Sequence, residues 1–189
     1  MRFYTQYFAD FSQILTTFLN APENEAKLSA TIKHLEATRQ TGKKIYLLGN
    51  GGSSAIAEHM AIDLTKNAGL KALTISGTPM LTTYANDYGY EKVFSQPLER
   101  FGDKGDVVLA ISSSGNSQNI VEACRVAKQK EMTLVTFTGF SRDNRVAGLG
   151  DINIWLDTKA FGYVEILHNL LIHYINDAII GSAEYMIKG

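Results

Sequence analysis

The sequence predicts an α/β fold, a three-layer αβα sandwich with a five-stranded parallel sheet, preceded by N-terminal helices. Three observations support this prediction. From residue 44 onward, short apolar runs typical of buried strands alternate with longer segments of helical periodicity. Residues 1–42 contain two further helical patterns ahead of the first strand. The 189 residues contain no linker and no low-complexity segment, so we expect a single domain over 1–189.

Residues 1–42 are expected to form two helices. In residues 2–19, aromatic and aliphatic side chains recur at helical spacing over a stripe too wide for one neighbour to cover. This stripe either packs on its own domain or forms a subunit interface in an oligomer, and both interpretations stay open. Pro22 suits the start of the second helix, which Gly42 ends.

The remaining elements alternate along the chain. We expect strands at residues 44–48, 71–75, 106–111, 132–137 and 152–156. Helices are expected between and after them, at 54–67, 91–101, 117–129 and 162–182. The stretch that contains ANDYGY, before the helix at 91–101, shows no clear period and is expected to be irregular.

Composition and charge exclude several classes of function. The net charge is −1 and no block of five basic residues occurs, which argues against non-specific nucleic-acid binding. No apolar run approaches the ~18 residues of a membrane span. Asp10 and other polar residues interrupt the N-terminal segment, which therefore does not read as a signal peptide, and we expect a cytoplasmic protein. The single cysteine, Cys124, excludes an internal disulfide and is expected to be a buried apolar residue.

Two loops rich in glycine and serine follow the first and the third predicted strand. The first, GNGGSS at 49–54, is not a nucleoside-triphosphate P-loop, because Gly52 is followed by Ser53 instead of lysine. It also lacks the third glycine of the dinucleotide fingerprint, where Ser54 stands, and no acidic residue follows the second strand. Because both loops leave the carboxyl edge of a parallel sheet, we expect them to face one ligand.

The second loop, SSSGNS at 112–117, has the features of a phosphate site. A helix begins at its end, so free backbone N–H groups and the positive end of the helix dipole favour an anion. Serine hydroxyls add hydrogen-bond donors without adding charge. The alternative is an ordinary helix cap, although a cap needs only one such residue. We predict that the loop binds a phosphate monoester through Ser112, Ser113, Ser114 and Ser117.

The stretch ISSSGNSQNI resembles the serine-rich loop of the SIS (sugar isomerase) domain family. Together with GNGGSSAIAEHMAIDL, ANDYGYEKVFSQPLE, TLVTFTG and AGLGDINI, it is similar to the phosphoheptose isomerase branch over nearly the whole chain. The resemblance implies a flavodoxin-like sandwich, usually a homotetramer, with the N-terminal helices in the subunit interface. It also implies conversion of sedoheptulose 7-phosphate to D-glycero-D-manno-heptose 7-phosphate through an ene-diol. The product would be used in lipopolysaccharide or capsule biosynthesis.

Histidines and carboxylates on two predicted helices form a candidate acid–base or metal set. His59 and Asp63 are four residues apart and share a helix face. On the last helix, Glu165 and His173 lie about 80° apart and are expected to converge, whereas His168 lies about 140° from His173 and is expected to be structural. The two imidazoles at 59 and 173 and the two carboxylates suit one tetrahedral zinc ion per subunit.

The resemblance also implies roles for these residues. Family members carry His and Glu four apart on the first of these helices, and Gln and His eight apart on the last. Asp63 and Glu165 therefore depart from the pattern, and Gly162 stands where the family has an aspartate. Asp63 and His173 are expected to transfer the proton, with either able to be the base. The sugar would contact Asn50, Gly51, Gly52, Ser53, Asn86, Asp87 and Glu165. For the Asn-Asp pair, a buried turn is the alternative.

Three other functions compete with a sedoheptulose 7-phosphate isomerase. One is a non-catalytic SIS-domain regulator of the type that associates with the replication initiator. Such relatives lose the active-site histidine and acid, whereas His59, Asp63 and His173 are all present here. The second is an isomerase of a different phosphosugar, which would be consistent with the two departures. The third is a sugar-phosphate sensor without catalytic activity.

Overall fold

The computed structural model describes residues 2–184 and confirms the predicted α/β fold with a parallel sheet. The strands lie in the order β2-β1-β3-β4-β5, which is the flavodoxin-like arrangement. Their bounds are β1 Ile45–Gly49, β2 Ala72–Thr74, β3 Val107–Ser112, β4 Thr133–Thr138 and β5 Ile152–Trp155. The helices are α1 Arg2–Leu19, α2 Pro22–Thr41, α3 Gly52–Lys66, α4 Thr78–Tyr88, η1 Tyr90–Lys92, α5 Ser95–Phe101, α6 Gln118–Gln129 and α7 Phe161–Ile180.

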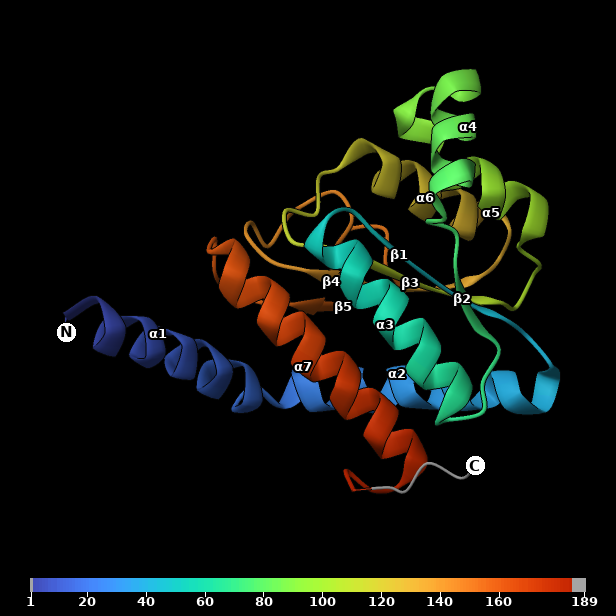
Figure 1. Ribbon diagram of the computed structural model, residues 1–189. Helices are drawn as coiled ribbons and strands as arrows, with labels where there is room; N and C mark the ends of the chain where they lie inside the picture. Colours follow the sequence, from blue (N-terminus) through green and yellow to red (C-terminus); the bar gives the residue numbers. More distant parts are fainter. Residues whose placement is uncertain (1, 185–189) are drawn as a thin grey trace.

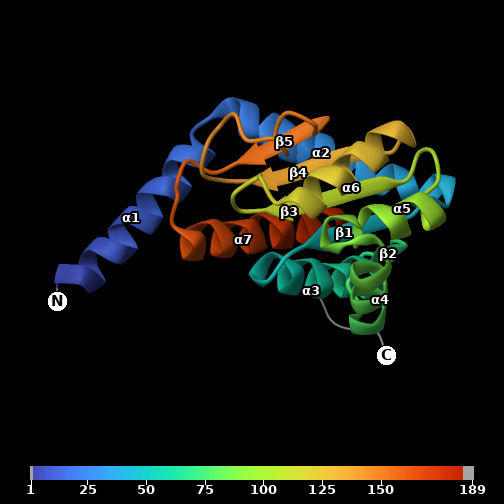
Figure 2. The ribbon, with the colours of Figure 1, turned by 90° about the horizontal axis from the view of Figure 1, so that it is seen from above.

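The sheet is covered on both faces, as a parallel sheet requires. Alternate residues of β1 point to opposite sides, so Ile45 and Leu47 join a core with α2, α3 and α7. Tyr46 and Leu48 join a second core with α5 and α6. Figure 1 shows α4, α5 and α6 on one side of the sheet and α2, α3 and α7 on the other. Helix α1 extends away from this body in both views (Figures 1 and 2).

The stretch expected to be irregular is in fact helical. Residues 78–88 form α4, which stands out from the body in Figure 1. Pro79 in its first turn fixes a helical φ, and Gly89, with a φ of +88°, ends it. No described residue of α4 is buried, so the apolar period that reveals a helix is weak there. The helix expected at 91–101 is also divided, into η1 and α5.

The sequence prediction about the single cysteine fits the structure. Cys124 is fully buried on α6, and burial raises the pKa of its thiol to about 12, so it is an unreactive apolar residue. Among residues 2–184, no helix is long and apolar enough to cross a lipid bilayer.

His168 on α7 is fully buried, and this burial makes the stability of the fold sensitive to acid. Nε2 lies 3.2 Å from the carbonyl oxygen of Thr138, while Nδ1 has no hydrogen-bond partner within the described part of the chain. Burial lowers the pKa of the imidazole to about 4, although the contact with Thr138 opposes this shift. The histidine is therefore a structural residue, as expected.

The free energy of unfolding is expected to fall as the pH drops from about 6.5 to about 4, because the unfolded chain binds a proton at His168 that the folded chain excludes. For the full shift the loss is about 3 kcal/mol. Urea unfolding of wild type and His168→Gln over this range tests the expectation. The glutamine variant should lose this component, and identical pH profiles for the two proteins would contradict it.

Candidate active site

The two glycine- and serine-rich loops meet at one edge of the sheet, as predicted. Strands β1 and β3 are neighbours in parallel register, with Gly49 beside Ile111, so the loops that follow them leave side by side. Side chains join the loops directly. The amides of Asn50 and Asn119 exchange two hydrogen bonds, of 2.9 and 2.8 Å between nitrogen and oxygen.

The first loop needs glycine for backbone reasons. A Cβ on Gly49 would lie 2.7 Å from the backbone carbonyl of Ser53, so the strand can pass under the start of α3 only without a side chain. Gly51 has a φ of +53° and turns the chain into α3. The carbonyl of Asn50 then accepts the N–H groups of Ser53 and Ser54, at 3.0 and 3.3 Å. Gly51 and Gly52 are exposed, so their backbone groups are accessible to a ligand.

The second loop carries its serines at the start of α6. Ser112 and Ser113 are buried, and the hydroxyl of Ser113 has no partner among the described residues. The hydroxyl of Ser114 accepts the N–H of Asn116 at 3.3 Å. Ser117 occupies the N-cap position, yet its side chain makes no capping hydrogen bond with the described first turn. The serine hydroxyls, with the N–H groups of the first turn, would suit a bound anion.

A third segment supports the serine-rich loop from behind. Gly115 has a φ of +64°, and a Cβ there would lie 1.9 Å from Oδ1 of the buried Asn144. The backbone N–H of Val146 donates to the carbonyl of Gly115 at 2.9 Å, and that of Arg145 donates to Asn116 Oδ1 at 3.2 Å. These contacts fix the loop before a ligand arrives.

The candidate acid–base groups lie where α3 and α7 pack side by side (Figure 1). Asp63 Oδ2 is 3.4 Å from Nε2 of His59 and 4.0 Å from Nδ1 of His173. The two imidazole rings are edge to face, with centres 5.1 Å apart. Side-chain exposure is 17% for Asp63 and 34% for His173, so the cluster is shielded but reachable.

Glu165 lies apart from these three residues. Potential ligand atoms of His59, Asp63 and His173 all fall within 4.8 Å of one another, and Glu165 is not in the group. Its carboxylate packs instead on Gly52, where a Cβ would be 2.6 Å away. Eight residues span about 12 Å along a helix, so residues 165 and 173 cannot both reach the same point unless one side chain extends far along α7. The structure thus brings together three of the four predicted metal ligands.

A cavity of about 300 Å³ extends from the glycine-rich loop to His59 of this cluster. It is lined by Gly52, Ala55, Ile56, His59, Glu165, Ile166 and Asn169. Glu165 and an imidazole of the cluster therefore face one space. Asn86 and Asp87, the predicted sugar contacts on α4, are exposed in its last turn. The side-chain amide of Asn86 donates a hydrogen bond to the carboxylate of Asp87 at 2.9 Å. They do not form the buried turn that was the alternative.

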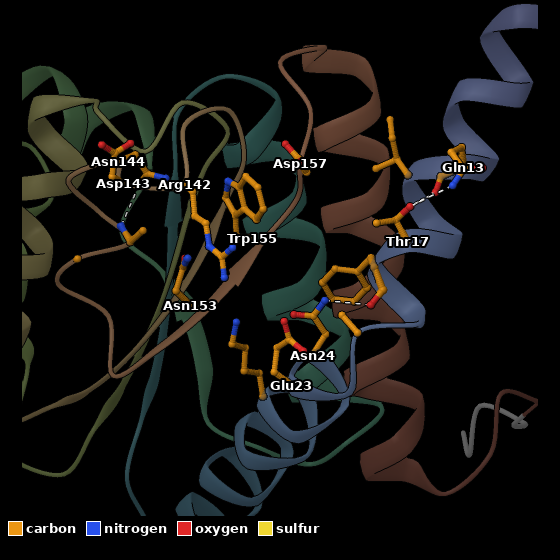
Figure 3. Close-up of a pocket in the computed structure, with 16 residues that line it drawn as sticks. Gln13, Thr17, Glu23, Asn24, Arg142, Asp143, Asn144, Asn153, Trp155 and Asp157 are labelled. Carbon is orange, nitrogen blue, oxygen red and sulfur yellow. Dashed lines mark hydrogen bonds between the residues drawn. The ribbon is translucent and has the colours of Figure 1, made fainter.

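A second cavity, of about 700 Å³, lies between the corner of α1 and α2 and the segments that follow β4 and β5 (Figure 3). The guanidinium of Arg142 stands 5.6 Å from the ring centre of Trp155 in its wall. Its lining, as far as the structure describes the chain, contains no histidine and none of the residues predicted for the site. We assign it no part in catalysis.

Sequence reasoning missed three residues that organise the site: Asn119, Asn144 and Tyr90. Asn119 and Asn144 are polar and buried. Asn119 contacts Asn50, 69 positions away in the chain, and Asn144 lies against Gly115, 29 positions away. The hydroxyl of Tyr90 donates to Asn50 Oδ1 at 3.2 Å. Asn119 stands within the quoted serine-rich stretch, but only its burial reveals that it faces inward.

Comparison with known proteins places this site in a family. A family model described as SIS domain matches residues 6–139. The phosphoheptose isomerase of Cytophaga hutchinsonii is 36% identical over 172 residues, which cover 85% of this chain and 90% of that protein. The chain belongs to the SIS domain family, in its phosphoheptose isomerase branch. The phosphoheptose isomerase of Vibrio cholerae serotype O1 is likewise 36% identical, over 87% of this chain and 88% of that one.

Solved structures of phosphoheptose isomerases share the fold of this SIS-domain chain. That of Neisseria gonorrhoeae superposes with a TM-score of 0.85 at 28% identity and covers 94% of this chain and 97% of its own. That of Francisella tularensis gives a TM-score of 0.86 at 26% identity, with coverage of 93% and 95%. The resemblance inferred from the serine-rich loop is therefore confirmed over most of the chain.

Proposed function

We propose that this SIS-domain protein is an aldose–ketose isomerase that converts sedoheptulose 7-phosphate to D-glycero-D-manno-heptose 7-phosphate. The observation that carries the proposal is the cluster of His59, Asp63 and His173, which gathers proton-transfer groups beside a cavity that begins at the glycine-rich loop and is lined by His59. Relatives at 36% identity that carry the name phosphoheptose isomerase support the choice of sugar.

The phosphate would bind at the serine-rich loop. Hydroxyls of Ser112, Ser113, Ser114 and Ser117 and the N–H groups at the start of α6 would donate hydrogen bonds to its oxygens. The sugar would extend toward α3, past the exposed backbone of Gly51 and Gly52 and the residues Asn50 and Ser53. The carboxylate of Glu165, which faces the same cavity as His59, would accept a hydrogen bond from a sugar hydroxyl. Asn86 and Asp87 would contact hydroxyls from the side of α4.

The chemistry needs one base and one acid near the carbonyl carbon. A base removes the proton from C1 of the ketose to give the ene-diol, and the proton returns at C2, while a hydroxyl proton moves between the two oxygens. No atom is gained or lost. Asp63 and His173 are close enough to share these tasks, with their nearest atoms 4.0 Å apart. Packing of α3 on α7 holds both groups in place before the sugar binds.

A zinc ion fits the donor set of His59, Asp63 and His173. Two nitrogens and one oxygen are a ligand set of catalytic zinc, which keeps a further position open. Ligands at ~2.1 Å from a tetrahedral ion are ~3.4 Å apart. The distance from Asp63 Oδ2 to His59 Nε2 is 3.4 Å, and that to His173 Nδ1 is 4.0 Å, so a small movement of His173 would complete the set. When bound, the ion would polarise the carbonyl oxygen of the sugar.

The exposed aromatic residues of α1 support a homotetramer. Phe3, Tyr4 and Phe8 are 80%, 69% and 53% exposed in the single chain, which is unusual for side chains of this size. Neighbouring subunits would cover them, so residues 1–42 would contribute to the interface.

The experiment that tests the function is a turnover assay on C5, C6 and C7 ketose phosphates, with substrates and products distinguished by NMR spectroscopy. We expect turnover of the seven-carbon sugar, with bound zinc measured by elemental analysis. Turnover of a shorter sugar alone would retain the isomerase and reject the substrate. No turnover, with or without added zinc, would instead favour the non-catalytic regulator or the sensor.

Replacing Ser114 with alanine is expected to weaken binding of the phosphosugar about 10-fold, because one hydrogen bond to a charged phosphate is lost. Isothermal titration with the sugar and with inorganic phosphate measures the change. Ser182→Ala, at the exposed end of α7, is the matched control and should bind like wild type. Equal affinities in all three proteins would show that the serine-rich loop does not hold the phosphate.

A further inference from the structure

The reciprocal amide pair of Asn50 and Asn119 is placed between the two halves of the site. Each side chain donates one N–H to the oxygen of the other. Asn119 is 2% exposed, and its Oδ1 also accepts the N–H of Ile120 at 3.0 Å, so its orientation is fixed within α6. Asn50 Oδ1 accepts a further hydrogen bond from Tyr90. The amide of Asn50 therefore contacts α6, and its oxygen already accepts two hydrogen bonds from protein groups, while these contacts use only one of its two N–H groups.

The pair joins the starts of two helices that carry different parts of the site. Asn50 precedes α3, and its carbonyl accepts the first N–H groups of that helix. Further along α3 stand His59 and Asp63. Asn119 lies in the first turn of α6, directly after the serine-rich loop at 112–117. The contact therefore links the loop predicted to bind phosphate with the helix that carries His59 and Asp63.

The hydrogen bonds between Asn50 and Asn119 are suited to holding the two helix starts at a fixed distance. Two hydrogen bonds between amides are directional and tolerate little change in distance, whereas apolar side chains can slide past one another. A buried amide pair of this kind adds only about 1 kcal/mol per hydrogen bond to stability. The arrangement therefore contributes more to geometry than to the free energy of folding. A displacement of 1 Å at a reacting centre can lower a rate about 100-fold.

We propose that Asn119 is a positioning residue which, through Asn50, sets the distance between the phosphate site and the acid–base cluster. This distance selects the chain length of the phosphosugar, because a sugar held by its phosphate must place C1 and C2 at Asp63 and His173. The inference rests on the proposed isomerase function. Asn119 itself, buried behind Asn50, touches no substrate.

The test is a double-mutant cycle of Asn50→Ala and Asn119→Ala, assayed on seven-carbon and five-carbon ketose phosphates. Asn119→Ala is expected to lower kcat for the seven-carbon sugar about 100-fold, with KM and the Kd for inorganic phosphate changed less than about 3-fold. The preference for seven over five carbons should fall about 10-fold. The double variant should be no worse than the poorer single variant, because both changes remove one contact.

Two further variants keep the test decisive. Gln118→Ala changes the neighbouring residue, whose side chain contacts Glu122 and Arg145 instead of Asn50, and should behave like wild type. Asn119→Asp keeps the size of the side chain and the acceptor for Ile120 but loses the N–H to Asn50. If the alanine variant does not fold, the aspartate variant should show the same loss of kcat and preference.

The outcomes separate the inference from the function on which it rests. An active wild type, with Asn119→Ala and Asn119→Asp both as active as Gln118→Ala, would overturn the inference and leave the isomerase intact. Additive losses in the double-mutant cycle would also overturn it, since Asn119 would then act independently of Asn50. A wild type that turns over no phosphosugar would overturn the proposed function and the inference together.

Discussion

Replacing His173 with alanine is expected to lower kcat/KM for sedoheptulose 7-phosphate about 10³-fold, the loss typical of a missing acid–base group. The imidazole lies 4.0 Å from Asp63 and is one third exposed, so it is accessible from solvent and carries little of the core packing. The fold should therefore persist, and the melting temperature should change by no more than a few degrees. NMR detection of both sugars measures the rate.

Two controls sharpen this result. His34→Ala removes an exposed histidine of α2 and should leave activity unchanged. His173→Gln keeps a polar side chain of similar reach, but it cannot transfer a proton, so it should be as inactive as the alanine variant. Elemental analysis of each protein should show less bound zinc in both variants at position 173. An alanine variant that retains more than one tenth of wild-type activity would exclude His173 from proton transfer.

Replacing Gly115 with alanine is expected to collapse the phosphate site. The residue has a φ of +64°, and its new methyl group would lie 1.9 Å from Oδ1 of Asn144, which is itself held by Ser141 and Ala147. The strain costs about 1–3 kcal/mol of unfolding free energy. The serine-rich loop should shift, with loss of about two hydrogen bonds to phosphate and an affinity about 100-fold lower.

Calorimetric titration with inorganic phosphate, together with urea unfolding, checks both parts of this expectation. Gly148→Ala is the matched control, because it lies in the supporting segment with no atom closer than 3.8 Å to the added carbon. It should bind phosphate like wild type. Unchanged phosphate affinity in a folded Gly115→Ala protein would contradict the assignment of the phosphate to this loop.

The elements that the sequence predicted well are those with strong local signals. All five strands and the long helices were found within two residues of their observed ends, because each buries a face with a clear period. Helix α4 was missed because none of its described residues is buried, so no apolar stripe distinguished it from a loop. The error placed Asn86 and Asp87 in an irregular segment, whereas they stand exposed in a helical turn.

In the candidate site, too, features with a local signal were predicted and features that depend on tertiary contacts were not. The composition and position of both loops were readable, since Gly49, Gly51 and Gly115 meet backbone constraints that only glycine satisfies. The structure brings together three of the four residues predicted for the metal and acid–base set. Helical angles correctly grouped His59 with Asp63, but an angle around α7 does not report the separation along its axis, and Glu165 proved to lie against Gly52.

The sequence by itself determined the alternation of strands and helices, the two glycine- and serine-rich loops at one sheet edge and the residue types available for proton transfer. These features depend on local sterics and periodicity, which neighbouring residues encode. Only the tertiary structure decided that Asp63 meets His173, that Glu165 stands apart, and that Asn119 joins α6 to the start of α3. Those contacts depend on how helices distant in the chain pack on the sheet, and packing of this kind is set by the whole core.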